Sequence, residues 1–261
     1  MKAIILSISS DIGKALTKTL KQKGYEIYGT YNLNKPNIGL PPSNLFQLDI
    51  KDFDSDKYKS WLKTIGCWDL FISCIGTQEP IGKLINVDIN RWTEAIAENS
   101  SYQIGALINA IKISSNEKKA DVIFFAGGGT NSANPYYSSY TLGKISLIKA
   151  VELLDNELNN IKFSILGPGW VQTKIHSQTI NAKDSAGDNF SKTLEMIQNP
   201  HRFNPMEKVI KDILKIISLP KDLVGGRNFS SVNDDLSIEN LKKLKKIDKD
   251  FYKLRRNLNK E

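Results

Sequence analysis

The chain has 261 residues, of which 40% are hydrophobic and 25% are charged, and its formal net charge is +8. This length and composition are typical of one globular α/β domain with a full core. They argue against a membrane protein, because no apolar run approaches the roughly 18 residues of a spanning helix. The apolar run after Lys2 is too short for a signal peptide, so we expect a cytoplasmic protein. Cys67 and Cys74 provide neither a disulfide framework nor a metal set.

The positive charge is concentrated in the last segment of the chain. Residues 241–261 hold nine Lys and Arg against three acids, so the rest is near neutral and we expect no nucleic-acid partner for the body of the domain. Apolar residues recur there at steps of three and four, which predicts a basic amphipathic helix within 233–261. They are Leu241, Leu244, Ile247, Phe251, Leu254 and Leu258. Two interpretations stay open: docking onto the domain or a partner subunit, or weak binding to an anionic lipid or nucleic acid.

Patterns of apolar strands and amphipathic helices alternate along residues 1–232. Strands are predicted at 2–7, 25–31, 45–49, 69–73, 122–125, 162–166 and 224–232, and helices up to 23, at 52–66, at 88–113, around Tyr140 and at 206–219. Residues 172–204 are polar with little periodicity, which predicts a lid or binding insertion. The alternation predicts a single α/β domain over 1–232 with a doubly wound parallel sheet in three layers.

Tyr140 and Lys144 are the first candidate functional pair. Four residues apart on a helix, they lie on the same face and can address one pocket. A nearby ammonium lowers the pKa of a tyrosine from its reference of about 10, which suits a proton donor or acceptor. A solvated helix face is the alternative interpretation.

The turn after the first strand is the second candidate site. A strand, a small polar turn and a helix present N–H groups and a helix N-terminus to a phosphate. Of the glycines in a dinucleotide fingerprint only Gly13 remains, because Ser7 and Asp11 occupy the other two positions. No carboxylate follows the strand at 25–31 and Lys35 lies close behind it, which favours NADP over NAD unless that lysine is merely solvated.

In their order and spacing these motifs resemble the short-chain dehydrogenases/reductases over residues 1–232, as a divergent member. The matching segments are Ser9–Gly13, Asp49, Ile75–Gly76, Asn99, Tyr140 with Lys144, and Pro168–Thr173. The resemblance implies a Rossmann-type sheet, NADP or else NAD as cofactor, and hydride transfer between a carbonyl and an alcohol. It also implies a small-molecule substrate and a homodimer or homotetramer.

The resemblance assigns a role to each matching residue. Tyr140 would be the general acid/base, Lys144 would lower its pKa and hold the nicotinamide ribose, and Asn99 would orient a water for proton relay. Besides Tyr140 and Lys144, the implied cofactor contacts are Ser7, Ser9, Ser10, Asp11, Ile12, Asp49, Ile50, Ile75, Gly76, Pro168, Gly169, Val171 and Thr173. The alternatives are a helix kink at Asn99, a helix cap at Asp49 and a loop hydroxyl at Thr173.

The chain also departs from the family pattern. The catalytic serine of the family precedes the tyrosine by about a dozen residues, where this chain has only Ala126–Gly129. Such a donor contributes on the order of 10²–10³ in rate. Thr130 could replace it, the N–H groups of Gly127–Gly129 could form a backbone oxyanion pocket, or the fold could be a silent dinucleotide-binding regulatory or scaffold module. After the fourth strand, Ser73–Gly76 replaces the usual Asn-Asn-Ala-Gly.

Substrate specificity is expected in residues 174–204. The candidate anion contacts there are Lys174, His176, Lys183, Lys192, His201 and Arg202. The glycine-rich stretches at 127–130 and 225–229 and the Leu-Arg-Arg tail resemble reductases of bacterial surface-polysaccharide pathways. That resemblance implies a phosphorylated or nucleotide-linked sugar as substrate.

Overall fold

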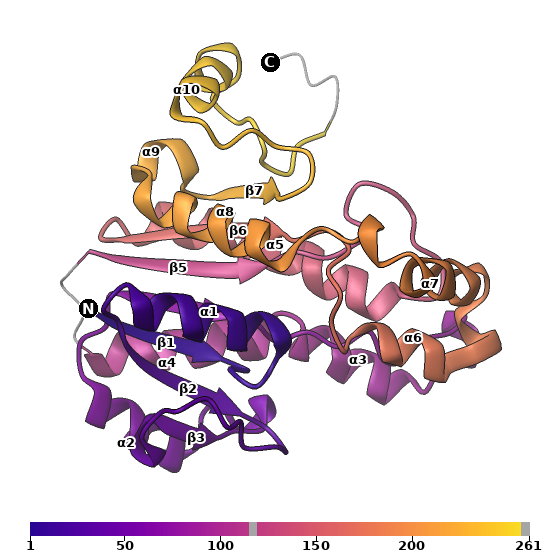
Figure 1. Ribbon diagram of the computed structural model, residues 1–261, viewed down its shortest axis with the longest axis horizontal. Coiled ribbons are helices and arrows are strands. Elements are labelled where there is room, and N and C mark those ends of the chain that lie inside the picture. The colour runs from indigo at the N-terminus through magenta and orange to yellow at the C-terminus, as the bar shows by residue number, and fades with distance from the viewer. Residues whose placement is uncertain (115–118, 257–261) are drawn as a thin grey trace.

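Seven parallel strands form the centre of the computed structural model, which describes residues 1–114 and 119–256 (Figure 1). The strands are β1 (Lys2–Leu6), β2 (Glu26–Tyr31), β3 (Leu45–Gln47), β4 (Leu70–Ser73), β5 (Ala120–Phe125), β6 (Ile161–Gly167) and β7 (Arg227–Ser230). Their order across the sheet is β3-β2-β1-β4-β5-β6-β7. The predicted doubly wound parallel sheet is therefore confirmed.

Helices cover both faces of this sheet, because parallel strands need crossover connections. They are α1 (Asp11–Gln22), α2 (Asp56–Ile65), α3 (Ile89–Glu98), α4 (Ser101–Ser114), α5 (Ser138–Glu157), α6 (His176–Ala182), α7 (Asp188–Gln198), α8 (Met206–Ser218), α9 (Lys221–Val224) and α10 (Ile238–Ile247). Helices α1 and α8 pack on one face, and α2, α4 and α5 pack on the other (Figure 1). In the described part of the chain, no helix has the length and apolarity to cross a membrane.

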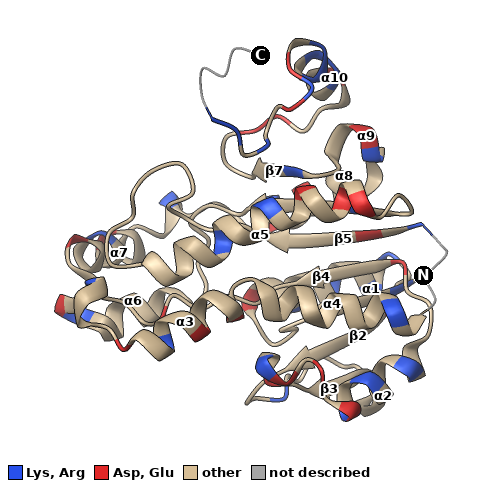
Figure 2. Ribbon diagram, turned by 180° about the vertical axis from the view of Figure 1, so that it is seen from behind, with Lys and Arg blue, Asp and Glu red and all other residues tan. Residues whose placement is uncertain are grey.

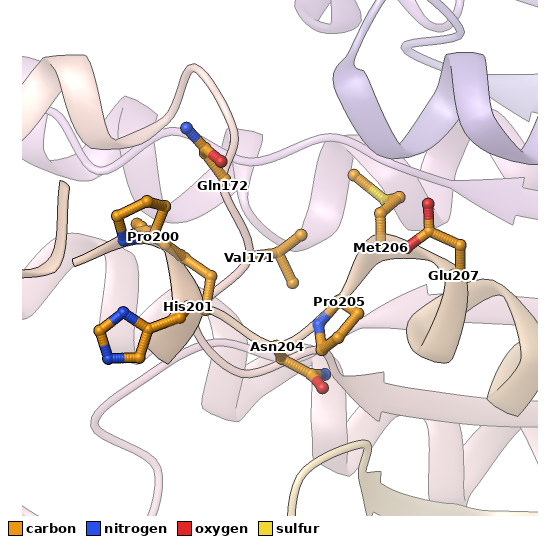
Figure 3. Close-up of a pocket in the computed structure, with 9 residues that line it drawn as sticks. Val171, Gln172, Pro200, His201, Asn204, Pro205, Met206 and Glu207 are labelled. Atoms are coloured by element: carbon orange, nitrogen blue, oxygen red, sulfur yellow. The ribbon is translucent and has the colours of Figure 1, made fainter. Parts of the chain in front are cut away.

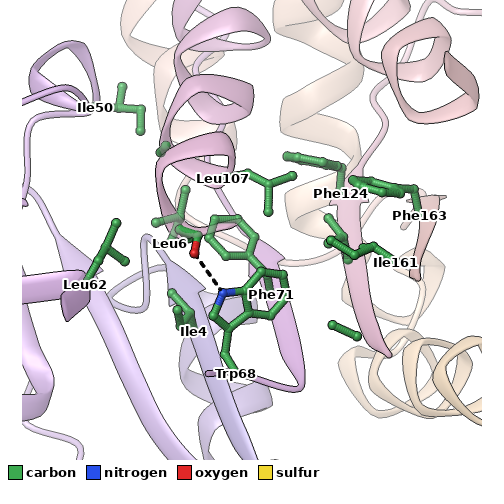
Figure 4. Packing of buried hydrophobic residues seen from close by; sticks show 14 of the residues in the cluster. Ile4, Leu6, Ile50, Leu62, Trp68, Phe71, Leu107, Phe124, Ile161 and Phe163 are labelled. Atoms are coloured by element: carbon green, nitrogen blue, oxygen red, sulfur yellow. Dashed lines mark hydrogen bonds between the residues drawn. The ribbon is translucent and has the colours of Figure 1, made fainter. Parts of the chain in front are cut away.

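The core consists of two clusters, one on each side of the sheet. Ile4 and Leu6 face α2 and α4, whereas Ala3 and Ile5 face α1 and α8, as the two-residue period of a strand dictates. On the first side the buried Trp68 donates from Nε1 to the carbonyl oxygen of Ala110 at 3.3 Å (Figure 4). This bond satisfies the polar atom of a large buried side chain.

The candidate residues lie at the carboxyl ends of the parallel strands. The chain turns from β3, β2 and β1 on one side to β4, β5 and β6 on the other, and ligands bind such sheets outside the strand ends at this switch point. Helices α6 and α7 lie at the same end of the molecule (Figure 1).

One helix predicted at 88–113 is in fact two, α3 and α4, with the break at Asn99 and Ser100. Asn99 Nδ2 donates to the carbonyl oxygen of Ala95, and Ser100 Oγ donates to that of Ile96. Side-chain bonds to carbonyls one turn earlier compete with the backbone ladder. Periodicity alone continues across this break, which explains the error.

The single amphipathic helix predicted for the tail is also wrong in its extent. Helix α10 ends at Ile247, which is 73% exposed, and the chain then folds back so that Phe251 is buried. Leu241 and Phe251 join the core cluster shared with α1 and α8. Leu258 lies outside the described residues. The tail thus docks onto its own domain, and α10 carries four lysines, of which Lys242, Lys243 and Lys246 are exposed (Figure 2).

Candidate active site

Tyr140 and Lys144 lie in the first turns of α5 and point into the domain. Tyr140 is 9% exposed and Lys144 is 2% exposed, so the solvated-face interpretation fails. The Lys144 ammonium lies 5.8 Å from the centroid of the Tyr140 ring and donates to the carbonyl oxygen of Ile75 at 3.1 Å. The pair therefore reaches from α5 to the segment that follows β4.

Burial dominates the acid–base properties of both groups. It raises the pKa of Tyr140 to about 12 and lowers the pKa of Lys144 to about 8. The expected lowering of the tyrosine pKa is therefore wrong. The free energy needed to remove a phenolate from water exceeds the electrostatic stabilisation that an ammonium provides at this distance. Burial also disfavours the charged form of the Lys144 amine.

Gly127 stands thirteen residues before Tyr140, where the family places its serine. A Cβ added to Gly127 would lie 2.3 Å from the Tyr140 hydroxyl oxygen. The tyrosine hydroxyl therefore fills the space that a serine side chain would need. Thr130 is half-buried, and among the described residues it forms no hydrogen bond with Tyr140.

Asn99 is completely buried at the end of α3, and main-chain groups occupy its amide. Nδ2 donates to the carbonyl oxygens of Thr77 and Ala95, and Oδ1 accepts from the Thr77 N–H at 3.2 Å. Both amide hydrogens are used, so this side chain holds the segment after β4 rather than presenting a free donor.

The turn after β1 has the geometry of a phosphate cradle. Ser7 takes the place of a glycine with a left-handed φ of +56°, and Ser10 Oγ caps α1 by accepting from the Gly13 N–H at 3.0 Å. Helices leave their first N–H groups without an intrahelical acceptor, and those of Asp11 and Ile12 find none elsewhere in the described chain. Two free donors at the positive end of a helix fit a dinucleotide pyrophosphate.

The carboxylate of Asp11 does not compete with that anion for the free donors of the turn. Its Oδ2 accepts from the N–H of Lys174 at 2.8 Å. This bond joins the first turn to the segment after β6 across 163 residues of sequence. The turn after β1 and the segment after β6, two of the predicted cofactor-binding segments, therefore lie next to each other.

The Pro168–Thr173 segment leaves β6 at the same sheet edge. Val171 is buried, and Thr173 is half-buried. A cavity of about 390 Å³ lies beside Val171 and Gln172, with His201, Asn204 and Glu207 on its other walls (Figure 3). Tyr140 and Lys144 do not line this cavity.

Asp49 caps a short 3₁₀ helix (Ile50–Asp52) after β3. Its Oδ1 accepts from the N–H of Lys51 at 3.2 Å, and Oδ2 lies 3.3 Å from the Lys51 ammonium. Ile50 is buried in the core. The geometry matches the cap interpretation for Asp49.

Two of the predicted anion contacts are already engaged. His176 stacks on Trp170 with ring centroids 5.1 Å apart, and its Nε2 lies 2.8 Å from the carbonyl oxygen of Val171. Burial lowers its pKa, which disfavours the charged imidazolium. Arg202 forms an ion pair with Glu195. Lys174, Lys183, Lys192 and His201 remain exposed.

Sequence patterns did not indicate a group of amide and hydroxyl side chains next to the pair. Gln178 of α6 bonds to Thr77 and Gln78, and the buried Gln103 accepts from Ser73 Oγ at 2.7 Å. Polar residues in an aperiodic stretch give no local signal of such a contact. Among the described residues, no three His, Cys, Asp or Glu side chains are grouped as metal ligands.

Comparison with known proteins adds a family. A family model described as enoyl-(acyl carrier protein) reductase matches residues 8–203. The 3-oxoacyl-(acyl-carrier-protein) reductase of Buchnera aphidicola is 25% identical over 182 residues, which cover 66% of this chain and 74% of that protein.

Solved structures share the fold at lower identity. A short-chain dehydrogenase/reductase of Saccharomyces cerevisiae superposes with a TM-score of 0.76 at 19% identity, covering 90% of this chain and 98% of the other. The aldohexose dehydrogenase of Thermoplasma acidophilum gives 0.73 at 14% identity, covering 90% and 96%. With a family model spanning most of the domain, the chain belongs to the short-chain dehydrogenases/reductases, which are NAD(P)-dependent oxidoreductases.

Proposed function

We propose that the protein reduces a carbonyl compound to an alcohol with NADPH, with Tyr140 as the proton donor. The observation that carries this proposal is the buried pair on α5, in which the Lys144 ammonium is held by Ile75 beside the Tyr140 ring. A tyrosine with a pKa of about 12 is fully protonated at neutral pH, as an acid must be.

The side chains divide the proton chemistry between them. When bound, NADPH would supply the hydride for the carbonyl carbon. Tyr140 gives its proton to the carbonyl oxygen, which leaves the alcohol and a phenolate. The Lys144 ammonium stabilises that phenolate, and a proton from solvent restores the phenol. Because Gly127 lets the Tyr140 hydroxyl occupy the serine position, one hydroxyl is both hydrogen-bond donor and acid.

The cofactor would lie along the sheet edge described above. The free N–H groups of Asp11 and Ile12 would hold its pyrophosphate, and Thr173 would face its nicotinamide end. NADPH rather than NADH is supported by the end of β2, where Tyr31 and Asn32 replace an acid and Lys35 is exposed. A dehydrogenase of similar fold, with a TM-score of 0.68 at 15% identity, was crystallised with NADPH.

For the substrate we propose a phosphorylated or nucleotide-linked keto-sugar, as in surface-polysaccharide synthesis. Lys174, Lys183 and Lys192 are exposed within residues 174–204, and they support an anionic group on the substrate. The aldohexose dehydrogenase among the similar structures acts on a sugar, whereas the Buchnera relative acts on a 3-oxoacyl thioester.

A substrate panel tests this proposal. NADPH oxidation would be followed by its absorbance. The substrates would be keto-sugar phosphates, nucleotide-linked keto-sugars, aldohexoses and a 3-oxoacyl thioester, and the panel would be repeated with NADH. We expect turnover with NADPH and an anionic keto-sugar. Cofactor binding without turnover on any carbonyl would instead support the silent dinucleotide-binding alternative, and turnover of the thioester alone would overturn the sugar assignment.

A further inference from the structure

The segment that follows β4, residues 75–78, is held on one side by Lys144 and Asn99. Lys144 donates to the carbonyl oxygen of Ile75 at 3.1 Å, and Asn99 bonds both the N–H and the carbonyl oxygen of Thr77. Between them, a Cβ added at Gly76 would lie 3.6 Å from the Lys144 ammonium and 3.8 Å from Asn99 Oδ1. A shift of this segment therefore moves the partners of Lys144 and Asn99 together.

Gln178 of α6 holds the same segment from the other side. Its Oε1 accepts from the Gln78 N–H at 2.8 Å, and its Nε2 donates to Thr77 Oγ1 at 3.2 Å. Both ends of one amide thus bond adjacent residues about a hundred positions away in sequence. No other side chain of α6 bonds the main chain of residues 75–78 within the described chain.

The next residue of α6 repeats the connection toward α5. Thr179 Oγ1 lies 3.1 Å from Gln78 Oε1 and 2.8 Å from the Tyr137 hydroxyl. Tyr137 directly precedes α5, three residues before Tyr140, and is buried with it in a small cluster that includes Ala186. Helix α6 is therefore bonded both to the segment after β4 and to Tyr137, the residue before α5.

We propose that Gln178 is a positioning residue, which couples the docking of α6 to the placement of Lys144 and Asn99 through residues 75–78. This inference rests on the proposed function, since it names the residue by which α6 positions the groups around Tyr140. Gln178 itself takes no part in proton or hydride transfer.

Three variants test the coupling in the full-length protein. Gln178→Ala removes both bonds, and Gln178→Glu keeps the acceptor for the Gln78 N–H but loses the donor to Thr77. Gln22→Ala changes an exposed glutamine at the end of α1 and is the control. The glutamate variant also serves if the alanine variant does not fold.

The first measurement is hydrogen exchange of two backbone amides, which requires no turnover. The Gln78 N–H loses its acceptor directly, whereas the Thr77 N–H bonds to Asn99 and reports the coupling. We expect both amides to exchange about tenfold faster in Gln178→Ala, with a smaller change in Gln178→Glu. Faster exchange of Gln78 alone would overturn the proposal.

The second measurement is kinetic. We expect kcat to fall about tenfold in Gln178→Ala, and NADPH affinity to stay within about twofold. The pH at which kcat falls on the alkaline side should also change, because the surroundings of Lys144 change. Gln178→Glu should restore part of kcat. A rise in KM with kcat and the pH profile unchanged would make Gln178 a substrate contact and overturn the proposal.

The two proposals fail separately. If the wild-type protein binds NADPH but reduces no carbonyl, the proposed function fails, while the exchange of the Thr77 amide still decides the coupling. If the enzyme turns over and the Thr77 amide is unaffected by Gln178→Ala, only the coupling fails.

Discussion

At the residue scale, the most informative position is the one where an expected side chain is missing. Gly127 leaves its space to the Tyr140 hydroxyl, 2.3 Å from where a Cβ would stand. From the sequence, Thr130 was the first candidate to replace the serine, but among the described residues it forms no hydrogen bond with Tyr140. The relevant adaptation is the placement of the tyrosine itself, which no spacing rule predicts.

Adding the family serine back should therefore harm the protein. Gly127→Ser forces its Cβ against the Tyr140 hydroxyl, and we expect a loss of unfolding free energy of about 1–3 kcal/mol, with no gain in kcat. Gly128→Ser is the matched control, because a Cβ there meets nothing within 4 Å. Urea unfolding of the two variants measures the difference. A more active Gly127→Ser protein would show that the serine space was simply empty.

The pair also sets a pH dependence. Burial lowers the pKa of Lys144 to about 8, and only its charged form stabilises the phenolate left after proton transfer. We expect kcat for carbonyl reduction to be constant at lower pH and to fall as the pH rises through about 8. A rate profile at saturating NADPH measures this, and a rate that rises through that range would contradict the role of Lys144.

At the element scale, side chains far apart in sequence fix where helices end and segments dock. Helix α3 ends where the Asn99 amide turns to Thr77, and α10 ends before the chain folds back onto β7. In the folded-back segment the Arg227 guanidinium lies 3.8 Å from the centroid of the Phe251 ring and donates to the Phe251 carbonyl oxygen. The periodic pattern predicted the apolar contacts of Leu241 and Phe251 but not this reversal.

The tail is fastened to α5 by an ion pair whose strength depends on pH. Arg255 donates to both carboxylate oxygens of Glu152, at 3.0 and 2.5 Å, and Lys149 donates to one of them at 2.8 Å. These bonds, those of Arg255 above all, lower the pKa of Glu152 to about 2. In the unfolded chain a glutamate titrates near 4.3. The stabilisation is therefore complete above about pH 4.3 and is lost as the pH falls toward 2.

Arg255→Met should lower the unfolding free energy at pH 7 by about 1–2 kcal/mol, because the pair is bidentate but Arg255 is partly exposed. The difference from wild type should shrink as the pH is lowered below about 4.3. Arg256→Met is the control, since Arg256 is exposed and adjacent. Denaturant unfolding at several pH values measures both, and a difference that grows in acid would refute the assignment.

At the scale of the whole molecule, the sequence was sufficient for the sheet and for the residues at its carboxyl edge. Seven strand patterns that alternate with helices indicate a doubly wound parallel sheet. In such a sheet the motifs after β1, β4 and β6 lie close together, because they follow the carboxyl ends of neighbouring strands. What the sequence could not supply were contacts between aperiodic polar segments, such as Gln178 with Thr77. Those bonds depend on three-dimensional proximity and leave no periodic pattern.

The role of Tyr140 is the centre of this account, and one comparison tests it directly. NADPH-dependent reduction would be measured for the wild type, Tyr140→Phe and Tyr58→Phe, the last being a buried tyrosine on α2 whose pKa burial also raises. We predict that Tyr140→Phe loses about 10²- to 10⁴-fold in kcat with unchanged NADPH affinity, while Tyr58→Phe keeps its activity. A Tyr140→Phe protein as active as the wild type would contradict the account.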